Sequence, residues 1–231
     1  KAEKIIEILE ESIKYSDLDF YLTASLGVAI YPEDGDTAQE LIKNADIAMY
    51  TAKESGKNQW KAFNKEMGVN LDYKSRLAND IHKAFEKEEF YLLYQPQINC
   101  VSKSIIGVEA LIRWNHPEFG VIMPGQFIQL AERNGLINEI GYWVINEVCK
   151  QIKSWKAKSS LDIKVAINIS AMQLNNYGFS DNIKEMIEKY QISPNSLEFE
   201  ITEGIAIKEN ITIAIQLQQL SKMGVSIVID D

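Results

Sequence analysis

The sequence predicts an α/β protein whose parallel strands are covered by helices on one face. Four apolar runs of β type each carry a polar or acidic residue near the end, at residues 105–115, 164–170, 196–202 and 225–231. Because residues two apart on a strand point to the same face, each run has one face with polar groups and one that is almost purely apolar. This pattern is typical of strands that helices cover on the outside, with functional groups facing inward at their carboxyl ends.

Candidate ligands for a cation lie on the polar faces of these runs. They are Glu109, Asn168, Glu200 and Asp230. Carboxylate and amide oxygens, without a thiolate or a nearby histidine, suit Mg²⁺ or Mn²⁺ better than zinc. Taken singly, Glu109 is equally well explained as a residue on a solvent-exposed strand face. Asn168 alone is explained as a structural amide held by a hydrogen bond. Four such groups on one face favour a common role.

Composition excludes several classes of protein. With 24 basic and 33 acidic residues, the formal net charge of −9 argues against binding of a nucleic-acid polymer. Cys100 and Cys149 form neither a disulfide framework nor a CxxC motif, so we expect a reducing, cytoplasmic location. No apolar run could span a membrane, so we expect no membrane contact by this segment. The chain starts within a helical pattern and stops directly after a strand, which predicts a piece of a longer protein; a membrane anchor upstream of Lys1 is left open.

The order of elements follows from periodicity and from turn residues. The predicted elements are a helix over residues 1–16, a strand over 20–30 with a break at Gly27, a turn over 31–36, a helix over 37–53, a linker helix over 64–77, a further helix over 78–89 and a strand over 90–98. Thr37 should cap the second helix, and Gly56 should end it.

Two segments near the start resemble the C-terminal half of the GGDEF domain, the diguanylate cyclase fold. They read SLGVAIYPEDG and ADIAMYTAKESGKNQW, and the similarity spans residues 18–63. The resemblance implies that Lys53 and Lys57 lie near a nucleotide phosphate; the alternative is two solvated lysines that complement the helix dipole. The GGDEF tetrad and the metal-binding aspartate upstream of it are absent from this sequence, so no cyclase activity is assigned to it.

The remainder resembles the EAL domain of cyclic di-GMP phosphodiesterases. The defining motif reads VEALIRWNHP at residues 108–117, and YQPQ, PGQFIQLAERNGLI, NIS, EITE and IDD stand where the family has them. The resemblance implies a partial, modified TIM-type (β/α) barrel whose first strand, residues 90–98, is antiparallel. The predicted domains are the C-terminal portion of a GGDEF domain at 1–63, a linker helix at 64–77 and an EAL domain at 78–231 that supplies strands one to five.

The resemblance also implies roles for individual residues. The metal ligands would be Glu109, which is also catalytic, Asn168, Glu200, Asp230 and, as a lesser candidate, Asp231. Two Mg²⁺ or Mn²⁺ ions at such a site can activate a water and hold a phosphodiester oxygen for in-line attack. Gln95 and Arg113 would contact the substrate, although a structural glutamine and a surface salt bridge remain alternatives. Glu203 would support a loop near the site, and His116 is expected to be a turn histidine rather than a general base.

Three interpretations of function follow. The first is a phosphodiesterase that hydrolyses cyclic di-GMP to linear pGpG, and the second is a catalytically silent receptor for cyclic di-GMP. The third is a scaffold for dimerisation, and we expect a homodimer in the intact protein. Retention of Glu109, Asn168, Glu200 and Asp230 favours the enzyme. Because the family needs further groups beyond Asp231, we expect these 231 residues to be inactive by themselves.

Overall fold

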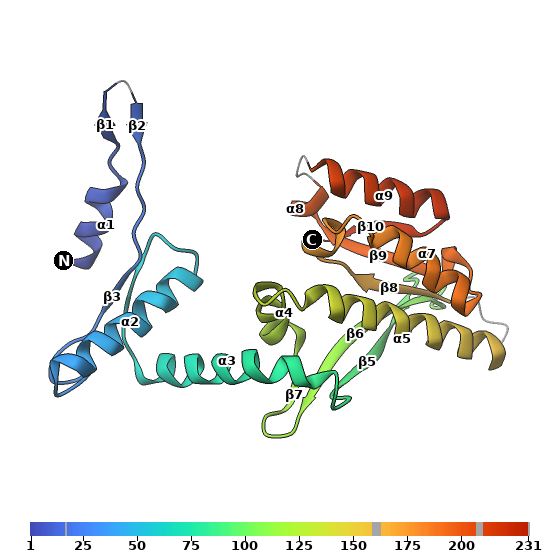
Figure 1. Ribbon diagram of the computed structural model, residues 1–231, viewed down its shortest axis with the longest axis horizontal. Helices are drawn as coiled ribbons and strands as arrows, with labels where there is room; N and C mark the ends of the chain where they lie inside the picture. The colour runs from blue at the N-terminus through green and yellow to red at the C-terminus, as the bar shows by residue number, and fades with distance from the viewer. Residues whose placement is uncertain (17, 159–162, 207–209, 231) are drawn as a thin grey trace. The chain divides into compact units, whose positions relative to one another are not determined.

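The structure is a computed structural model that describes residues 1–16, 18–158, 163–206 and 210–230 (Figure 1). The chain forms two compact units, Lys1–Arg76 and Leu77–Asp231. Both units combine helices with strands, which confirms the predicted α/β class. The prediction for Asp231 lies outside the described residues.

The first unit contains two small sheets and the helices beside them. Its elements in chain order are α1 (Ala2–Glu10), β1 (Ile13–Tyr15), β2 (Leu18–Phe20), β3 (Leu26–Val28), α2 (Ala38–Glu54) and β4 (Trp60–Ala62). β1 and β2 pair antiparallel, whereas β3 and β4 pair in parallel. α2 packs against β3 and β4.

Two predicted elements of this unit are wrong in extent. The predicted helix over residues 1–16 ends at Glu10, because residues 13–15 pair with residues 18–20 and take their backbone hydrogen bonds from that hairpin. The predicted strand over 20–30 is divided between two sheets, and the described residues between β2 and β3 belong to no strand. Local periodicity does not reveal such a change of partner.

Thr37 caps α2 as predicted. Its hydroxyl accepts a hydrogen bond of 3.2 Å from the backbone N–H of Glu40. The Glu40 carboxylate accepts one of 3.2 Å from the N–H of Thr37, which completes a capping box. The helix ends at Glu54, and Gly56 follows with φ +115°, in the left-handed region that favours glycine.

The two helices predicted on either side of residue 77 form one element, α3 (Lys65–Ala84). The predicted continuation to residue 89 is wrong, because the helix ends at Ala84 and residues 85–88 form a turn. Leu77, Ile81 and Ala84 recur at helical spacing and are fully buried. This apolar stripe makes the C-terminal half of α3 part of the second unit's core.

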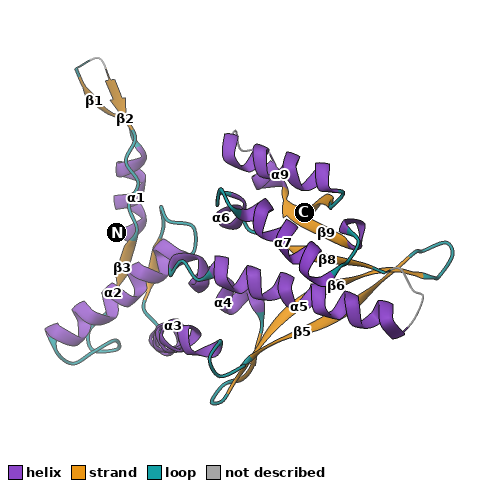
Figure 2. Ribbon diagram, turned by 45° about the vertical axis from the view of Figure 1, so that its right-hand side comes forward, coloured by secondary structure: helices purple, strands orange, loops and turns teal. Residues whose placement is uncertain are grey.

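The second unit is built on one six-stranded sheet (Figure 2). Its strands are β5 (Phe90–Ile98), β6 (Ile105–His116), β7 (Gly120–Ile122), β8 (Lys164–Asn168), β9 (Leu197–Thr202) and β10 (Ser226–Asp230). The order is β10-β9-β8-β6-β5, and β7 pairs with β6. β5 runs antiparallel to β6, whereas β6, β8, β9 and β10 are parallel. The sheet is thus a partial TIM-type barrel with an antiparallel first strand, as predicted.

Helices cover one face of this sheet. They include α4 (Pro124–Arg133), α5 (Ile137–Lys158), α6 (Ala171–Leu174), α7 (Phe179–Tyr190), α8 (Glu203–Ala206) and α9 (Ile211–Met223), with a short 3-10 turn at Pro194–Ser196. Val165, Phe199 and Ile201 on the covered face are at most 2% exposed. Among the helices that the structure describes, none is both long and apolar enough to cross a membrane.

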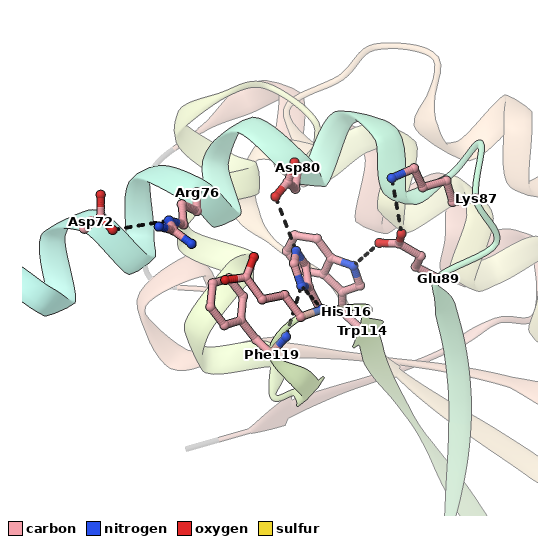
Figure 3. Close-up of polar contacts among 9 residues, drawn as sticks. Asp72, Arg76, Asp80, Lys87, Glu89, Trp114, His116 and Phe119 are labelled. Carbon is pink, nitrogen blue, oxygen red and sulfur yellow. Dashed lines mark hydrogen bonds and ion pairs between the residues drawn. The ribbon is translucent and has the colours of Figure 1, made fainter.

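His116 holds the end of β6 against α3 (Figure 3). Its Nδ1 accepts hydrogen bonds from the backbone N–H groups of Glu118 and Phe119 at 3.1 and 3.3 Å. The hydrogen-bond pattern therefore assigns the ring proton to Nε2, which lies 3.4 Å from Asp80 Oδ2. The residue is 4% exposed, so it is a structural histidine at the β6–β7 turn.

A substitution at Gly27 tests the packing of α2 on β3. A Cβ atom at this position would overlap the backbone of Ala45 and Met49 in α2. We expect Gly27→Ala to destabilise the first unit by about 3 kcal/mol, since backbone atoms cannot move aside as a side chain can. Scanning calorimetry of the variant should show an early transition for this unit.

Gly68→Ala is the matched control for this experiment. Gly68 lies within α3, and a Cβ atom there would meet nothing within 4 Å. This variant should gain up to about 1 kcal/mol of helix stability. A Gly27→Ala protein that melts like the wild type would contradict the observed packing.

Candidate functional site

Glu109 and Asn168 meet on the adjacent strands β6 and β8. Glu109 is opposite Ala166 in the parallel pair, and Asn168 follows two residues later on the same face. Asn168 Nδ2 donates a hydrogen bond of 2.8 Å to Glu109 Oε1. Because this bond uses the amide nitrogen, Oδ1 is the Asn168 atom that would bind a cation.

Glu200 and Asp230 continue the row on β9 and β10. Asn168 is directly opposite Glu200, and Asp230 is opposite Thr202, two residues beyond Glu200. Register therefore brings all four predicted ligands that the structure describes to one face, toward the carboxyl ends of the parallel strands. The other face is apolar and lies under the helices.

The carboxyl group of Glu200 has a strongly raised pKa. Partial burial raises this pKa from 4.5 to about 7, because burial disfavours the charged form. The negative charges of Glu109, Asp230 and Glu198 act in the same direction. These carboxylates are thus close enough to repel one another.

Glu198 lies on the same face but has a different partner. It is opposite Ala166 in the β8–β9 pair, one layer nearer the amino ends of the strands. Lys164 Nζ lies 3.4 Å from Glu198 Oε2 and donates a hydrogen bond of 3.0 Å to Ser226 Oγ. This ion pair keeps a positive charge at Glu198, so we do not include Glu198 among the candidate cation ligands.

The donor chemistry of this row fits a hard divalent cation. Glu109, Glu200, Asp230 and Asn168 supply only oxygen ligands, and a cation among them would remove the repulsion between the carboxylates. In the described part of the chain, however, no group of three or more His, Cys, Asp or Glu side chains is arranged to hold a metal ion. The carboxylates must therefore move closer together for three of them to share one.

The two predicted substrate-binding residues lie on the same face of the sheet. Gln95 in β5 is opposite Glu109 and is exposed. Arg113 in β6 is four residues beyond Glu109 and is half-buried. Its Nη1 donates a hydrogen bond of 2.9 Å to the carbonyl oxygen of Ile112, so the guanidinium lies along its own strand.

A cavity of about 440 Å³ lies beside the carboxylates. Asn168, Glu200 and Thr202 line it from the strand ends, and apolar side chains of α4 and α5 such as Ile128 and Val144 line the rest. Pockets of this kind, mostly apolar with a few polar groups, are typical of small-molecule sites. The sequence does not reveal this cavity, because it forms only where α4 and α5 pack against the strand ends.

Gln97 is a further polar residue of this face, outside the predicted site. The Gln97 amide lowers the pKa of the Glu200 carboxyl group, in opposition to burial. Because Gln97 is two residues from Gln95, strand alternation places both on the same face. The effect on Glu200 is not visible in the sequence, because Gln97 and Glu200 are distant in it.

The remaining predicted residues are not on the strands that carry this row. Glu203 is exposed at the start of α8. Lys53 and Lys57 are exposed in the first unit, the former in the last turn of α2 and the latter with φ +59°. Their surroundings leave open both a phosphate-binding role and the alternative of solvated lysines.

Comparison with protein families divides the chain into two regions. The model of the EAL domain matches residues 78–231. The model of the diguanylate cyclase GGDEF domain matches residues 1–59. The two matches stand in tandem, in the order that the sequence motifs predict.

Relatives match the chain over its whole length. The bifunctional diguanylate cyclase/cyclic di-GMP phosphodiesterase MucR of Pseudomonas aeruginosa is 40% identical over 230 residues, covering 100% of this chain and 34% of the relative. The cyclic di-GMP phosphodiesterase PdeR of Escherichia coli is 34% identical, again covering 100% of this chain and 34% of the relative. The chain thus spans about a third of the length of these relatives.

Solved structures agree with the family match. The complex of the PaMucR phosphodiesterase with c-di-GMP aligns with a TM-score of 0.65 at 40% identity, over 68% of this chain and 63% of that one. The EAL enzyme Bd1971 with cAMP and cyclic di-GMP bound aligns with a TM-score of 0.65 at 28% identity, over 86% of this chain and 52% of that one. With the antiparallel first strand and the row of acidic residues at the strand ends, these matches show that the chain belongs to the EAL domain family, preceded by a match to the GGDEF domain.

Proposed function

We propose that the protein containing this chain is a phosphodiesterase that hydrolyses cyclic di-GMP to linear pGpG with two divalent metal ions. The observation that carries the proposal is the row of Glu109, Asn168, Glu200 and Asp230 on one face of the partial barrel. It is supported by relatives that are named cyclic di-GMP phosphodiesterases.

In this proposal each residue of the row has a role. The ligands of Mg²⁺ or Mn²⁺ would be Glu109, Asn168 through its Oδ1, Glu200 and Asp230, with Asp231 as a further ligand. The ions, when bound, supply Lewis acidity and lower the pKa of a bound water. The hydrogen bond from Asn168 orients the Glu109 carboxylate, and the crowded carboxylates bind a cation in place of a proton.

Substrate contacts in this proposal come from both sides of the row. Arg113 would turn from the Ile112 carbonyl to grip a phosphate with two parallel bonds. Gln95, exposed opposite Glu109, would contact the ligand. The mostly apolar cavity beside Asn168 and Glu200 would shelter a flat, partly apolar group such as a nucleobase. Glu203 would support the loop beside the strand ends.

The other expectations remain part of the proposal. We propose a GGDEF portion at residues 1–63, a linker helix at 64–77 and an EAL domain at 78–231. We also propose that the intact protein is a homodimer and is located in the cytoplasm. Lys53 and Lys57 would contribute a remnant of a phosphate site in the GGDEF region.

The second candidate function is a receptor that binds cyclic di-GMP without turnover. The observation that favours it is that no described group of three acidic, histidine or cysteine side chains is arranged to hold a metal ion. A receptor needs the ligand-binding face and the cavity, but it does not need the carboxylates to close around a cation.

Hydrolysis of cyclic di-GMP by the full-length protein tests the two candidates. We expect Mn²⁺- or Mg²⁺-dependent release of pGpG, and we expect Glu109→Ala to lower kcat/KM by at least about 100-fold, since even residues that only support metal ligands typically contribute 10- to 100-fold. The control is Gln218→Met on an exposed position of α9. A folded protein that binds cyclic di-GMP without turnover would instead establish the receptor.

The raised pKa of Glu200 gives a second prediction, on stability. Because this pKa is about 7 in the folded protein and 4.5 without the fold, the ionised carboxylate destabilises the metal-free protein increasingly as pH rises from about 4.5 through 7. Glu200→Gln removes the charge. We expect it to stabilise the metal-free protein at pH 8 by about 1 kcal/mol, or about 2–4 °C in Tm, after solvent screening is allowed for.

The measurement is thermal denaturation in the presence of a chelator at pH 5 and pH 8. The gain from Glu200→Gln should be present at pH 8 and should nearly vanish at pH 5. Glu185→Gln, at an exposed position of α7, is the control for loss of a carboxylate as such. Added Mn²⁺ should raise the Tm of the wild type and not that of Glu200→Gln; equal gains at both pH values would refute the electrostatic explanation.

A further inference from the structure

The pairing between β6 and β8 ends at Glu109, halfway along β6. β6 is paired with β8 from Gly107 to Glu109, whereas β5 accompanies it as far as Trp114. The cavity of about 440 Å³ begins directly after the β6–β8 ladder, where residues 110–112 line it. Arg113 belongs to this second half of β6. The position of Arg113 therefore depends on β5 and on the contacts at the far end of the strand.

Trp114 anchors this half of the strand on the covered face of the sheet (Figure 3). It is fully buried, and its ring centroid lies 5.7 Å from those of Phe90 and Phe127. Its Nε1 donates a hydrogen bond of 2.8 Å to Glu89 Oε2. The backbone carbonyl of Glu89 accepts a second hydrogen bond of 2.8 Å from the N–H of Asn115. One residue between α3 and β5 thus holds both the side chain and the backbone at the end of β6.

Glu89 is itself fixed to the end of α3. Its backbone N–H donates a hydrogen bond of 2.9 Å to the carbonyl oxygen of Ala84, the last residue of that helix. Its side chain is 12% exposed, and Lys87 Nζ lies 3.9 Å from the second carboxylate oxygen. Asp80 adds a longer contact from α3, 3.4 Å from His116 Nε2. The end of β6 is therefore joined to α3 and the turn after it at two points.

Arg113 lies on the opposite face of the strand from Trp114. Consecutive residues of a strand point to opposite faces, so the buried indole and the guanidinium share one short piece of backbone. Glu109, by contrast, belongs to the part of β6 that β8 holds. A displacement at the end of β6 would therefore move Arg113 and leave the carboxylate row in place.

We infer that Glu89 is a positioning residue for substrate binding, which acts through Trp114 and holds Arg113 where it can bind a phosphate. This role rests on the proposed function, in which Arg113 contacts the substrate. A displacement of about 1 Å is enough to disturb the two parallel hydrogen bonds that an arginine makes to a phosphate. Because Glu89 acts on the covered face, opposite the carboxylates, its loss should leave metal binding unchanged.

The test is the steady-state kinetics of the full-length protein with cyclic di-GMP and Mn²⁺. Glu89→Met keeps the approximate length of the side chain and removes the acceptor of Trp114. We expect KM to rise about 10-fold, the equivalent of one hydrogen bond to a charged group, because Arg113 binds substrate and transition state alike. The kcat should stay within about twofold of the wild type. The dissociation constant of Mn²⁺, measured by electron paramagnetic resonance, should not change.

Two further variants separate positioning from stability. Glu89→Gln keeps a carbonyl oxygen as the acceptor for Trp114, so it should restore the wild-type KM. Lys87→Met removes only an exposed ion-pair partner of Glu89 and should also leave KM unchanged. Melting of each variant in a chelator checks that it is folded. A purely structural role would lower Tm and the fraction of active protein, and so the apparent kcat, without raising KM.

A double variant shows whether Glu89 acts through Arg113. Arg113→Met should raise KM by itself, since it removes the phosphate contact. In that background Glu89→Met should raise KM no further, because the contact that Glu89 positions is already lost. Additive effects of the two substitutions on the free energy of substrate binding would overturn the inference.

The outcomes separate this inference from the proposed function. A wild type that hydrolyses cyclic di-GMP, together with a folded Glu89→Met protein of wild-type KM, overturns the positioning role alone. A wild type that binds cyclic di-GMP without turnover overturns the phosphodiesterase, and the dissociation constant of cyclic di-GMP then replaces KM in each comparison. A wild type that neither binds nor hydrolyses cyclic di-GMP overturns both.

Discussion

Burial of one face of the six-stranded sheet beneath helices is the constraint on which the rest of the second unit depends. Val165, Phe199 and Ile201 on that face are almost fully buried. Because side chains alternate along a strand, burying these residues directs Glu198, Glu200 and Asn168 to the other face. A slip of one residue in β6, β9 or β10 would place carboxylates under the helices, which is energetically costly, so the apolar face fixes the register.

The same constraint creates the electrostatic character of the site. Partial burial raises the pKa of Glu200, and the charges of Glu109 and Asp230, which register brings to the same face of the parallel strands, add to this effect. The repulsion between these carboxylates lowers the stability of the metal-free fold. A bound cation would remove this destabilisation. Polar contacts reduce this cost, because Asn168 donates a hydrogen bond to Glu109 and Lys164 forms an ion pair with Glu198.

The end of β6 is held by a separate polar network (Figure 3). Trp114 Nε1 donates a hydrogen bond of 2.8 Å to the carboxylate of Glu89. His116 faces Asp80 of α3. Trp114 is fully buried and His116 nearly so. The strand that carries Glu109 and Arg113 is thus fixed at its carboxyl end by residues from α3 and from the turn after it.

The sequence by itself predicted the α/β class and the common face of Glu109, Asn168, Glu200 and Asp230, because strand alternation is a local signal. The antiparallel first strand followed from the resemblance to the EAL family. Only the tertiary structure decided the division of residues 20–30 between two sheets, the end of α3 at Ala84 and the cavity beside Glu200. The physical reason is that each of these depends on which distant segment becomes the partner. Backbone hydrogen bonds, cavities and side-chain contacts across a curved sheet are set by packing between segments, and local periodicity does not encode that choice.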